Sequence, residues 1–312
     1  MTKWMKKIGW VFSFWLLQNT VTWAQQLTQY TNFVFNYQLV NPAAIGYTTC
    51  TEFKSTYRQQ WAGIEGAPKT TSALVHARLR ANRNAFQGIG AVVETDQAGA
   101  FGGTGFTLNY SYHTRFTKGY NLAAGIGLGF MQYRIDFTKL NFQDPLGETA
   151  ITNTVNDYII PNINMGFWLY RADRFYGLAI KSVTNGKVEG TQATKYNRHY
   201  TLTYGKYIKV SKDLAFKPSF MFRWVKSTRP AIDAQLLLSY KKAFSIGLAA
   251  RNGHGFSALI KMELLDQITI GYAYDVTLNK LRYGSYSTHE ICLGIRTCAV
   301  LGKEKALCAA YD

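Results

Sequence analysis

Alternation of apolar and polar side chains, repeated along almost the whole chain, is the feature that most constrains the fold. The clearest case is residues 104–116, where Phe106 and Leu108 face one way while Thr107 and Asn109 face the other. Successive side chains of a β-strand point to opposite faces, so this period predicts strands with one apolar and one polar face. A helical period never extends beyond a turn or two, which argues against a mainly helical fold.

About fourteen segments show this alternation, and the lengths of their connections form a second pattern. We expect strands over residues 51–61, 70–79, 87–95, 104–116, 121–137, 159–170, 175–183, 198–209, 214–225, 231–240, 243–251, 255–264, 268–277 and 287–298. The connections 62–69, 96–103, 138–158, 184–197 and 278–286 are long, and most of those between them are short. An even strand number with short turns on one rim and longer loops on the other is typical of outer-membrane β-barrels.

The N-terminus predicts export. Lys3, Lys6 and Lys7 precede an apolar run over residues 8–17, and small residues stand just before an expected cleavage site after Ala24. This pattern is a secretory signal peptide over residues 1–24. The apolar run is shorter than the roughly 20 residues that a membrane helix needs, and no other apolar run is longer. Since lipid tolerates only helices and closed barrels, a barrel remains.

The predicted fold is therefore all-β: a transmembrane antiparallel β-barrel of about 14 strands over residues 51–299, with periplasmic termini because the count is even. Residues 25–50 are a lead-in segment, for which a plug in the lumen and a periplasmic position both stay open. Gly125, Gly127 and Gly129 on one strand face indicate room for something packed inside, or strong curvature. Residues 300–312 are a C-terminal tail.

Net charge indicates which binding partners to expect, and the cysteine positions indicate which disulfides are possible. Removing Lys3, Lys6 and Lys7 lowers the formal net charge from +17 to +14. In an exported barrel this charge favours a hydrated lumen and outer-membrane lipid as surroundings over nucleic acid, which we do not expect as a partner. Cys292 and Cys298 are six residues apart on one expected strand, too far to bridge, whereas Cys298 and Cys308 are sterically able to pair.

Motifs for catalysis, cofactors and metals are not found. Gly63, Gly66, Lys69 and Thr70 only superficially resemble a phosphate loop, because the spacing is wrong and Pro68 lacks an N–H. The five histidines are scattered, and His289-Glu290 lacks the following His of a zinc motif. A hydrolase site assembled across strands stays an open alternative. The charged residues on polar strand faces are expected to line the lumen: Lys54, Arg58, Arg115, Lys217, Arg223, Glu263 and Arg296.

Four motifs, in this order, carry a resemblance to a known family. They are Asn41-Pro42-Ala43-x-x-Gly46, Trp61-x-Gly63-Ile64-x-Gly66-Ala67-Pro68-Lys69-Thr70, Gly271-Tyr272-Ala273-Tyr274-Asp275 and Ser287-x-His289-Glu290. Together they resemble the PorP/SprF outer-membrane proteins of the Bacteroidetes type IX secretion system. The resemblance covers essentially the whole mature chain. The tail does not end in the aromatic residue common at the end of outer-membrane strands.

The resemblance implies a function that periodicity and charge do not. It implies a barrel that binds or anchors a secreted surface protein, adhesin-like and carrying a C-terminal sorting domain, with contacts to other secretion components and a link to gliding motility. The motif residues would be structural or partner contacts, without a catalytic role. The alternative is a passive outer-membrane pore or hydrophobic-solute channel. We expect the connection 62–69 on the extracellular rim, with Trp61 at the lipid interface.

Overall fold

The computed structural model describes residues 28–48, 50–81, 84–117, 119–139, 155–184, 197–226, 228–265, 267–278, 284 and 287–297. Its strands are β1 Glu52–Gln59, β2 Lys69–Ala81, β3 Ala85–Ala98, β4 Phe101–Arg115, β5 Asn121–Asp136, β6 Val155–Arg171, β7 Arg174–Lys181, β8 His199–Lys206, β9 Ile208–Lys209, β10 Leu214–Val225, β11 Ala231–Tyr240, β12 Phe244–Arg251, β13 Gly255–Leu264, β14 Ile268–Thr277 and β15 Ser287–Arg296. Its short helices are α2 Tyr37–Val40, η1 Pro42–Ala44 and η2 Phe137–Lys139. The expected signal peptide, most of the connections 138–158, 184–197 and 278–286, and the tail lie outside these residues.

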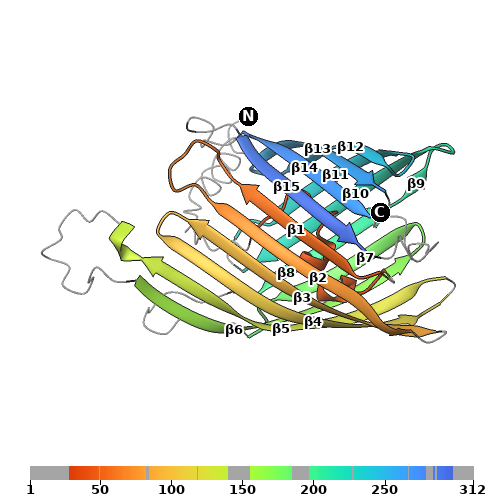
Figure 1. Ribbon diagram of the computed structural model, residues 1–312, viewed down its shortest axis with the longest axis horizontal. Helices are drawn as coiled ribbons and strands as arrows, with labels where there is room; N and C mark the ends of the chain where they lie inside the picture. Colours follow the sequence, from red (N-terminus) through yellow and green to blue (C-terminus); the bar gives the residue numbers. More distant parts are fainter. Residues whose placement is uncertain are drawn as a thin grey trace, which may run out of the picture.

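The strands form one closed antiparallel barrel (Figure 1). Each strand pairs with its neighbours in sequence, and β1 pairs with β15, which joins the first strand to the last. Both β8 and the two-residue β9 pair with β10, so they act as one strand interrupted at Tyr207 and the wall has 14 strands. Closure leaves the sheet without a free edge in lipid, which is why a barrel can span a membrane.

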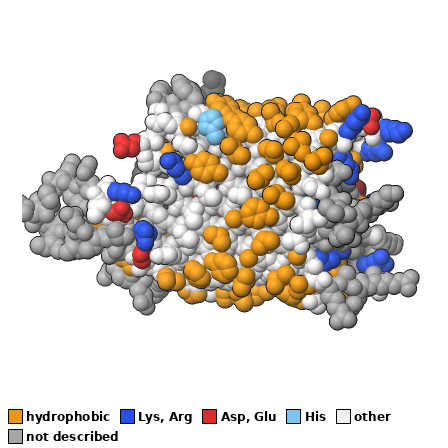
Figure 2. All heavy atoms as spheres, viewed as in Figure 1, with side chains coloured by type: hydrophobic (Ala, Val, Ile, Leu, Met, Phe, Trp, Pro, Cys, Tyr) orange, Lys and Arg blue, Asp and Glu red, His pale blue; other side chains and the backbone are white. Residues whose placement is uncertain are grey.

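The predicted strands and their faces are confirmed in this wall. On β4, Leu108, Tyr110 and Tyr112 are exposed on the outside, whereas Ser111 and His113 are buried within. The same alternation along the other strands gives the outer face its cover of hydrophobic side chains (Figure 2). Apolar side chains are favoured on the outer face because it contacts lipid, and polar side chains lie on the enclosed inner face.

The two ends of the barrel differ, and we name them by their connections. The turn rim, on the right in Figure 1, carries tight turns such as Lys241–Lys242, where both residues have left-handed backbone (φ 49° and 61°). The loop rim, at the opposite end, carries the connection 60–68. Strand β1 runs from the turn rim to the loop rim and β15 runs back, so the paired residues Glu52 and Arg296 place both barrel ends at the turn rim. That the turn rim is periplasmic stays a prediction.

Residues 28–48, which we call the lumen segment, lie inside the barrel. Their side chains are almost all buried, including Phe33, Tyr37 and Tyr47 at 1% exposure each. Tyr37 packs edge-on against Phe175, with ring centroids 4.6 Å apart, and against Trp168 at 5.5 Å. These rings form an apolar core between the segment and strands β6 and β7.

Among the three glycines on one face of β5, Gly125 gives the lumen segment room. A Cβ atom on Gly125 would collide with the backbone of Pro42 and Ala43, whereas Cβ atoms on Gly127 and Gly129 would strike neighbouring strand atoms. The expectation of room for a packed element therefore holds at Gly125. The other two glycines relieve crowding within the wall itself.

We predict that Gly125→Ala lowers the free energy of unfolding by about 1–3 kcal/mol, because overpacking forces the segment and wall apart. Gly103→Ala, on β4, is the matched control, since the nearest heavy atom to its added Cβ would be 3.8 Å away. Urea unfolding of the purified barrel in detergent measures both. Equal stability of the two variants would contradict close packing at Gly125.

Candidate functional site

The fixed position of the lumen segment begins with the Asn41-Pro42 motif. Pro42 opens η1 and holds Asn41 in an extended conformation, with φ −139° and ψ 117°. The Asn41 side chain accepts a hydrogen bond from the Ala43 N–H at 2.9 Å, which caps the turn. Its amide nitrogen donates to the carbonyls of Phe167 at 3.0 Å and Leu178 at 3.1 Å. One motif residue thus ties the segment to β6 and β7.

A second attachment lies nearer the turn rim, at Ile45 and Gly46. The Ile45 carbonyl accepts hydrogen bonds from the Ser111 hydroxyl at 2.7 Å and from His113 at 2.8 Å. Gly46 has φ +70° and its backbone lies directly against Gly88, so neither position has space for a side chain. This attachment fixes the chain just before it turns into β1.

The third attachment, near the loop rim, is an ionic cluster of Arg58, Asp275 and Glu290, which we call the mouth clamp. Arg58 donates to Glu290 at 3.0 Å and to Asp275 at 2.8 Å. Glu290 accepts from the backbone N–H groups of Thr31 at 2.7 Å and Asn32 at 2.8 Å. The Thr31 hydroxyl donates to Asp275 at 2.7 Å. Three strand residues thus hold one end of the lumen segment.

The mouth clamp is buried, which makes its pairing important. Glu290 is 0% exposed and Arg58 is 2% exposed. A buried charge is tolerated only when it is paired and hydrogen-bonded, and here one guanidinium and two backbone N–H groups face two carboxylates. Removal of Arg58 would leave two carboxylates without a cation, and removal of Glu290 would leave the Thr31 and Asn32 N–H groups without their acceptor.

A neighbouring cluster holds Tyr30. Asp233 forms ion pairs with Arg223, at 2.7 Å, and with Arg251. Arg251 also donates to the Tyr30 carbonyl at 2.9 Å, while the Tyr30 hydroxyl donates to Glu94 at 3.0 Å. Tyr30 is therefore held between β12 and β3, on opposite sides of the lumen.

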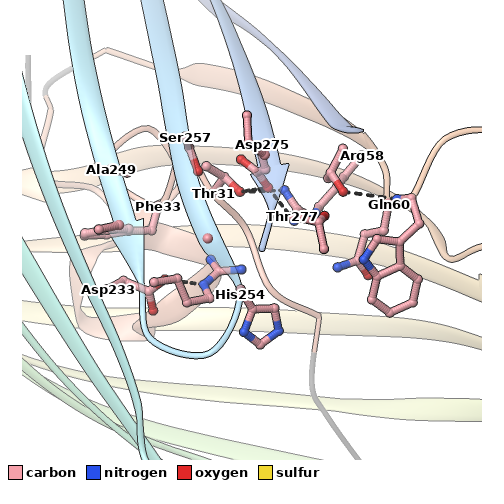
Figure 3. A pocket seen from close by; sticks show the side chains of 16 residues that line it. Thr31, Phe33, Arg58, Gln60, Asp233, Ala249, His254, Ser257, Asp275 and Thr277 are labelled. Carbon is pink, nitrogen blue, oxygen red and sulfur yellow. Dashed lines mark hydrogen bonds and ion pairs between the residues drawn. The ribbon is translucent and has the colours of Figure 1, made fainter. Parts of the chain in front are cut away.

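Next to these clusters, the mouth has an open recess of about 480 Å³. Thr31, Phe33, Arg58, Asp275 and His254 are among its lining residues (Figure 3). Burial lowers the pKa of His254, and the positive charge of Arg251 lowers it further, so the ring is neutral at neutral pH. The recess is thus lined by polar and paired charged groups together with one aromatic ring of the lumen segment.

The connection 60–68 braces the loop rim. The Trp61 N–H donates to the Thr288 hydroxyl at 3.1 Å, and the Ala62 N–H donates to the Ser287 carbonyl at 2.9 Å. On the other side, the Gly66 carbonyl accepts from the Gly99 N–H at 2.8 Å. This hairpin therefore reaches from β15 to the β3–β4 connection.

The motif residues of this hairpin have distinct positions. Trp61, Gly63 and Gly66 have φ of 44°, 98° and 70°, which explains the two glycines. Ala67 donates to the Ile64 carbonyl, Pro68 accepts from Gln60, and Lys69 begins β2. Trp61 is among the residues that line the recess. Its expected position at the level of the lipid interface stays a prediction.

The motifs of β14 and β15 each have residues on the inner face and residues on the outer face of the wall. Asp275 and Glu290 point inward to the mouth clamp, whereas Tyr272, Tyr274 and His289 lie on the outer face. The Tyr272 hydroxyl lies 2.8 Å from His289 Nδ1, and the Tyr274 ring meets the His289 ring edge-on at 5.3 Å. The structure thus brings Asp275 and Glu290 together with the lumen segment and keeps the other three apart from it.

Sequence reasoning found only part of this site. Among the expected lumen charges, Lys54, Arg58, Lys217, Arg223, Glu263 and Arg296 are inward-facing and buried or half-buried. Arg115 is instead exposed at the turn-rim end of β4. Asp233, Arg251, Tyr30 and Thr31 were missed. The available signal was an acidic residue, Asp233, on the polar face of a strand that is otherwise uncharged.

Metal-ligand clusters and membrane-spanning helices are absent from the described part of the chain. Within it, no group of three or more His, Cys, Asp or Glu residues is arranged to hold a metal ion. None of the helices in the same residues is long and apolar enough to cross a membrane. Cys292 is a buried free thiol in the lumen, 3.8 Å from the Asn36 amide nitrogen.

Comparison with known families identifies the chain. The model of the type IX secretion system membrane protein PorP/SprF family matches residues 22–295. The chain belongs to this family. The resemblance inferred from the four motifs is thereby confirmed, and the protein is an integral protein of the outer membrane. A comparison with curated protein sequences gave no match.

Solved structures share the fold of this PorP/SprF family member at low identity. The Pseudomonas putida toluene transporter TodX is 8% identical, with a TM-score of 0.50 over 86% of this chain and 94% of TodX. The Acinetobacter baumannii outer-membrane protein Omp33 is 8% identical, with a TM-score of 0.47 over 80% and 99% of the two chains. A Pseudomonas aeruginosa FadL homologue is 11% identical, with a TM-score of 0.46 over 86% and 94%. These similarities concern the barrel fold alone.

We predict that Glu290→Gln loosens the lumen segment. The change removes one of the two negative charges that face Arg58. It also replaces one of the two carboxylate oxygens that accept from the Thr31 and Asn32 N–H groups by an NH2 donor. Breaking a buried ion pair costs about 3–5 kcal/mol, so amide hydrogen exchange at residues 30–34 should rise together with a loss of stability.

The control for this variant is Asp157→Asn. Asp157 pairs with Arg134 at 2.9 Å, but both side chains are exposed, at 39% and 59%. Exposed pairs contribute little, so exchange at residues 30–34 should stay unchanged. Wild-type exchange in Glu290→Gln would show that the mouth clamp does not hold the segment.

Proposed function

We propose that this protein binds or anchors a secreted surface protein, a client with a C-terminal sorting domain, at the loop rim of its barrel. Membership of the PorP/SprF family supports the link to type IX secretion and to its other components. The same family resemblance suggests a role in gliding motility. The barrel would then act as an anchor in the membrane rather than as an enzyme.

The observation that carries this proposal is the filled and fastened lumen. Three attachments, at Asn41, Ile45 and the mouth clamp, hold the lumen segment along its length. A protein client would have to displace all three to pass through. Contact on the outer surface of a rim requires no such displacement, and the braced hairpin 60–68 offers a rigid surface there.

The proposal that the protein is not an enzyme is supported by the use of two of its buried histidines, His76 and His113. His76 lies 3.1 Å from Glu52 and accepts the Gly46 N–H, and His113 contacts Tyr170 and the Ile45 carbonyl. Both rings are fully buried in attachments of the lumen segment. Their roles are structural, and neither lies beside the open recess.

The test is client display in cells with and without the gene. Deletion should lower the cell-surface amount of one or more sorting-domain proteins and raise their amount in the medium or periplasm. Glu65→Lys, at an exposed position of the hairpin 60–68, should lower display while the barrel level is unchanged. Asp213→Lys, an equivalent charge change at an exposed position of the turn rim, is the matched control. Unchanged display of every sorting-domain protein after deletion would refute the proposal.

The alternative function, a passive pore or hydrophobic-solute channel, makes the opposite prediction for conductance. We expect the purified barrel to be nearly silent in planar bilayers, because the lumen segment occupies its interior. Glu290→Gln should add brief openings, and Asp157→Asn should not. Steady conductance of the unmodified protein would instead favour a pore.

A further inference from the structure

The direction in which the lumen segment runs through the barrel follows from the wall residues that it contacts. Tyr30 and Thr31 contact Glu94, Asp275 and Glu290, which lie toward the loop-rim ends of β3, β14 and β15. These contacts place the beginning of the segment at the loop rim.

Later residues contact the wall progressively nearer the turn rim. Asn36 donates to Thr56, at the middle of β1, at 2.9 Å. The Tyr47 carbonyl accepts from Arg78, near the turn-rim end of β2, at 2.8 Å. The chain then enters β1 at Glu52, on the turn rim itself. The segment therefore crosses the barrel from one rim to the other.

The ring through which it passes is closed. Pairing between neighbouring strands, including β1 with β2 and with β15 and β10 with β11, makes the described strands a closed ring. We infer that the lumen segment is threaded through the closed barrel, so that the mature N-terminus emerges at the loop rim, opposite the end of β15. On this inference the two ends of the mature chain lie at opposite rims, so that only one of them would be periplasmic.

The reach of the chain supports this position. With the expected cleavage after Ala24, only three residues precede Thr28. They span at most about 10 Å when fully extended. The apolar band of an outer-membrane barrel is about 25 Å tall, which is more than a stretch of three residues can span.

The threaded end adds to the surface at the loop rim. Thr31 and Phe33 line the mouth recess together with Trp61 of the braced hairpin and His254. A polypeptide bound at this rim would meet the outer end of the lumen segment as well as the loops. This last step rests on the proposed function, whereas the threading does not.

Cysteine labelling tests the threading. Three variants, Thr28→Cys, Glu65→Cys and Lys212→Cys, are made in a chain whose four native cysteines are replaced by serine. Glu65 marks the loop rim and Lys212 the turn rim, and both are exposed. A membrane-impermeant maleimide applied to intact cells should label positions 28 and 65 alike and leave position 212 unlabelled until the cells are permeabilised.

The pattern separates threading from orientation. Labelling of position 28 together with position 212, and not with position 65, would overturn the inference. Labelling of position 212 alone in intact cells would support threading and would overturn the loop-rim orientation on which the proposed function depends. The two proposals can thus fail separately.

A cross-link gives a second measurement within the folded barrel. Asn36→Cys would place a thiol beside the native Cys292, because the Asn36 amide nitrogen lies 3.8 Å from its sulfur. Mild oxidation should join positions 36 and 292 in most molecules, as detected by peptide mass, and Cys292→Ser should abolish the cross-link. A folded barrel that forms no cross-link would show that the segment lies elsewhere.

Discussion

Backbone hydrogen bonding in a medium without water is the constraint on which this structure depends. Every N–H and C=O group of the wall needs a partner, and pairing of β1 with β15 supplies the last set by closing the sheet. Closure creates an enclosed polar face, which must be hydrated or filled. Here the chain fills it with its own residues 28–48, whose polar groups then need partners from the wall. The mouth clamp and the Asn41 contacts are consequences of that need.

The sequence predicted the wall well because a membrane imposes a simple rule on each strand. Lipid on one side and an enclosed lumen on the other produce a strict two-residue period, and the confirmed strands follow it from β1 to β15. Loop lengths then fixed the two rims. The tight packing at Gly125 was also readable, because a wall glycine is useful where another backbone approaches.

The contacts of the lumen segment were not predictable in the same way. They depend on which strands lie opposite one another across the barrel. No local sequence pattern shows which strands these are. Asp275 and Glu290 were found through their motifs. That both bind Thr31 became clear only from the register of β14 and β15, which places them close together. Asp233, Arg251 and Tyr30 carried no motif.

The seam between β1 and β15 has a further consequence for biogenesis. These strands are the first and the last of the barrel, and the segment contacts both, through Arg58 and Thr56 on one side and Glu290 on the other. The register of this seam and the position of the interior chain therefore depend on each other, because the same side chains contact both. We expect the seam and the segment to be fixed together during assembly.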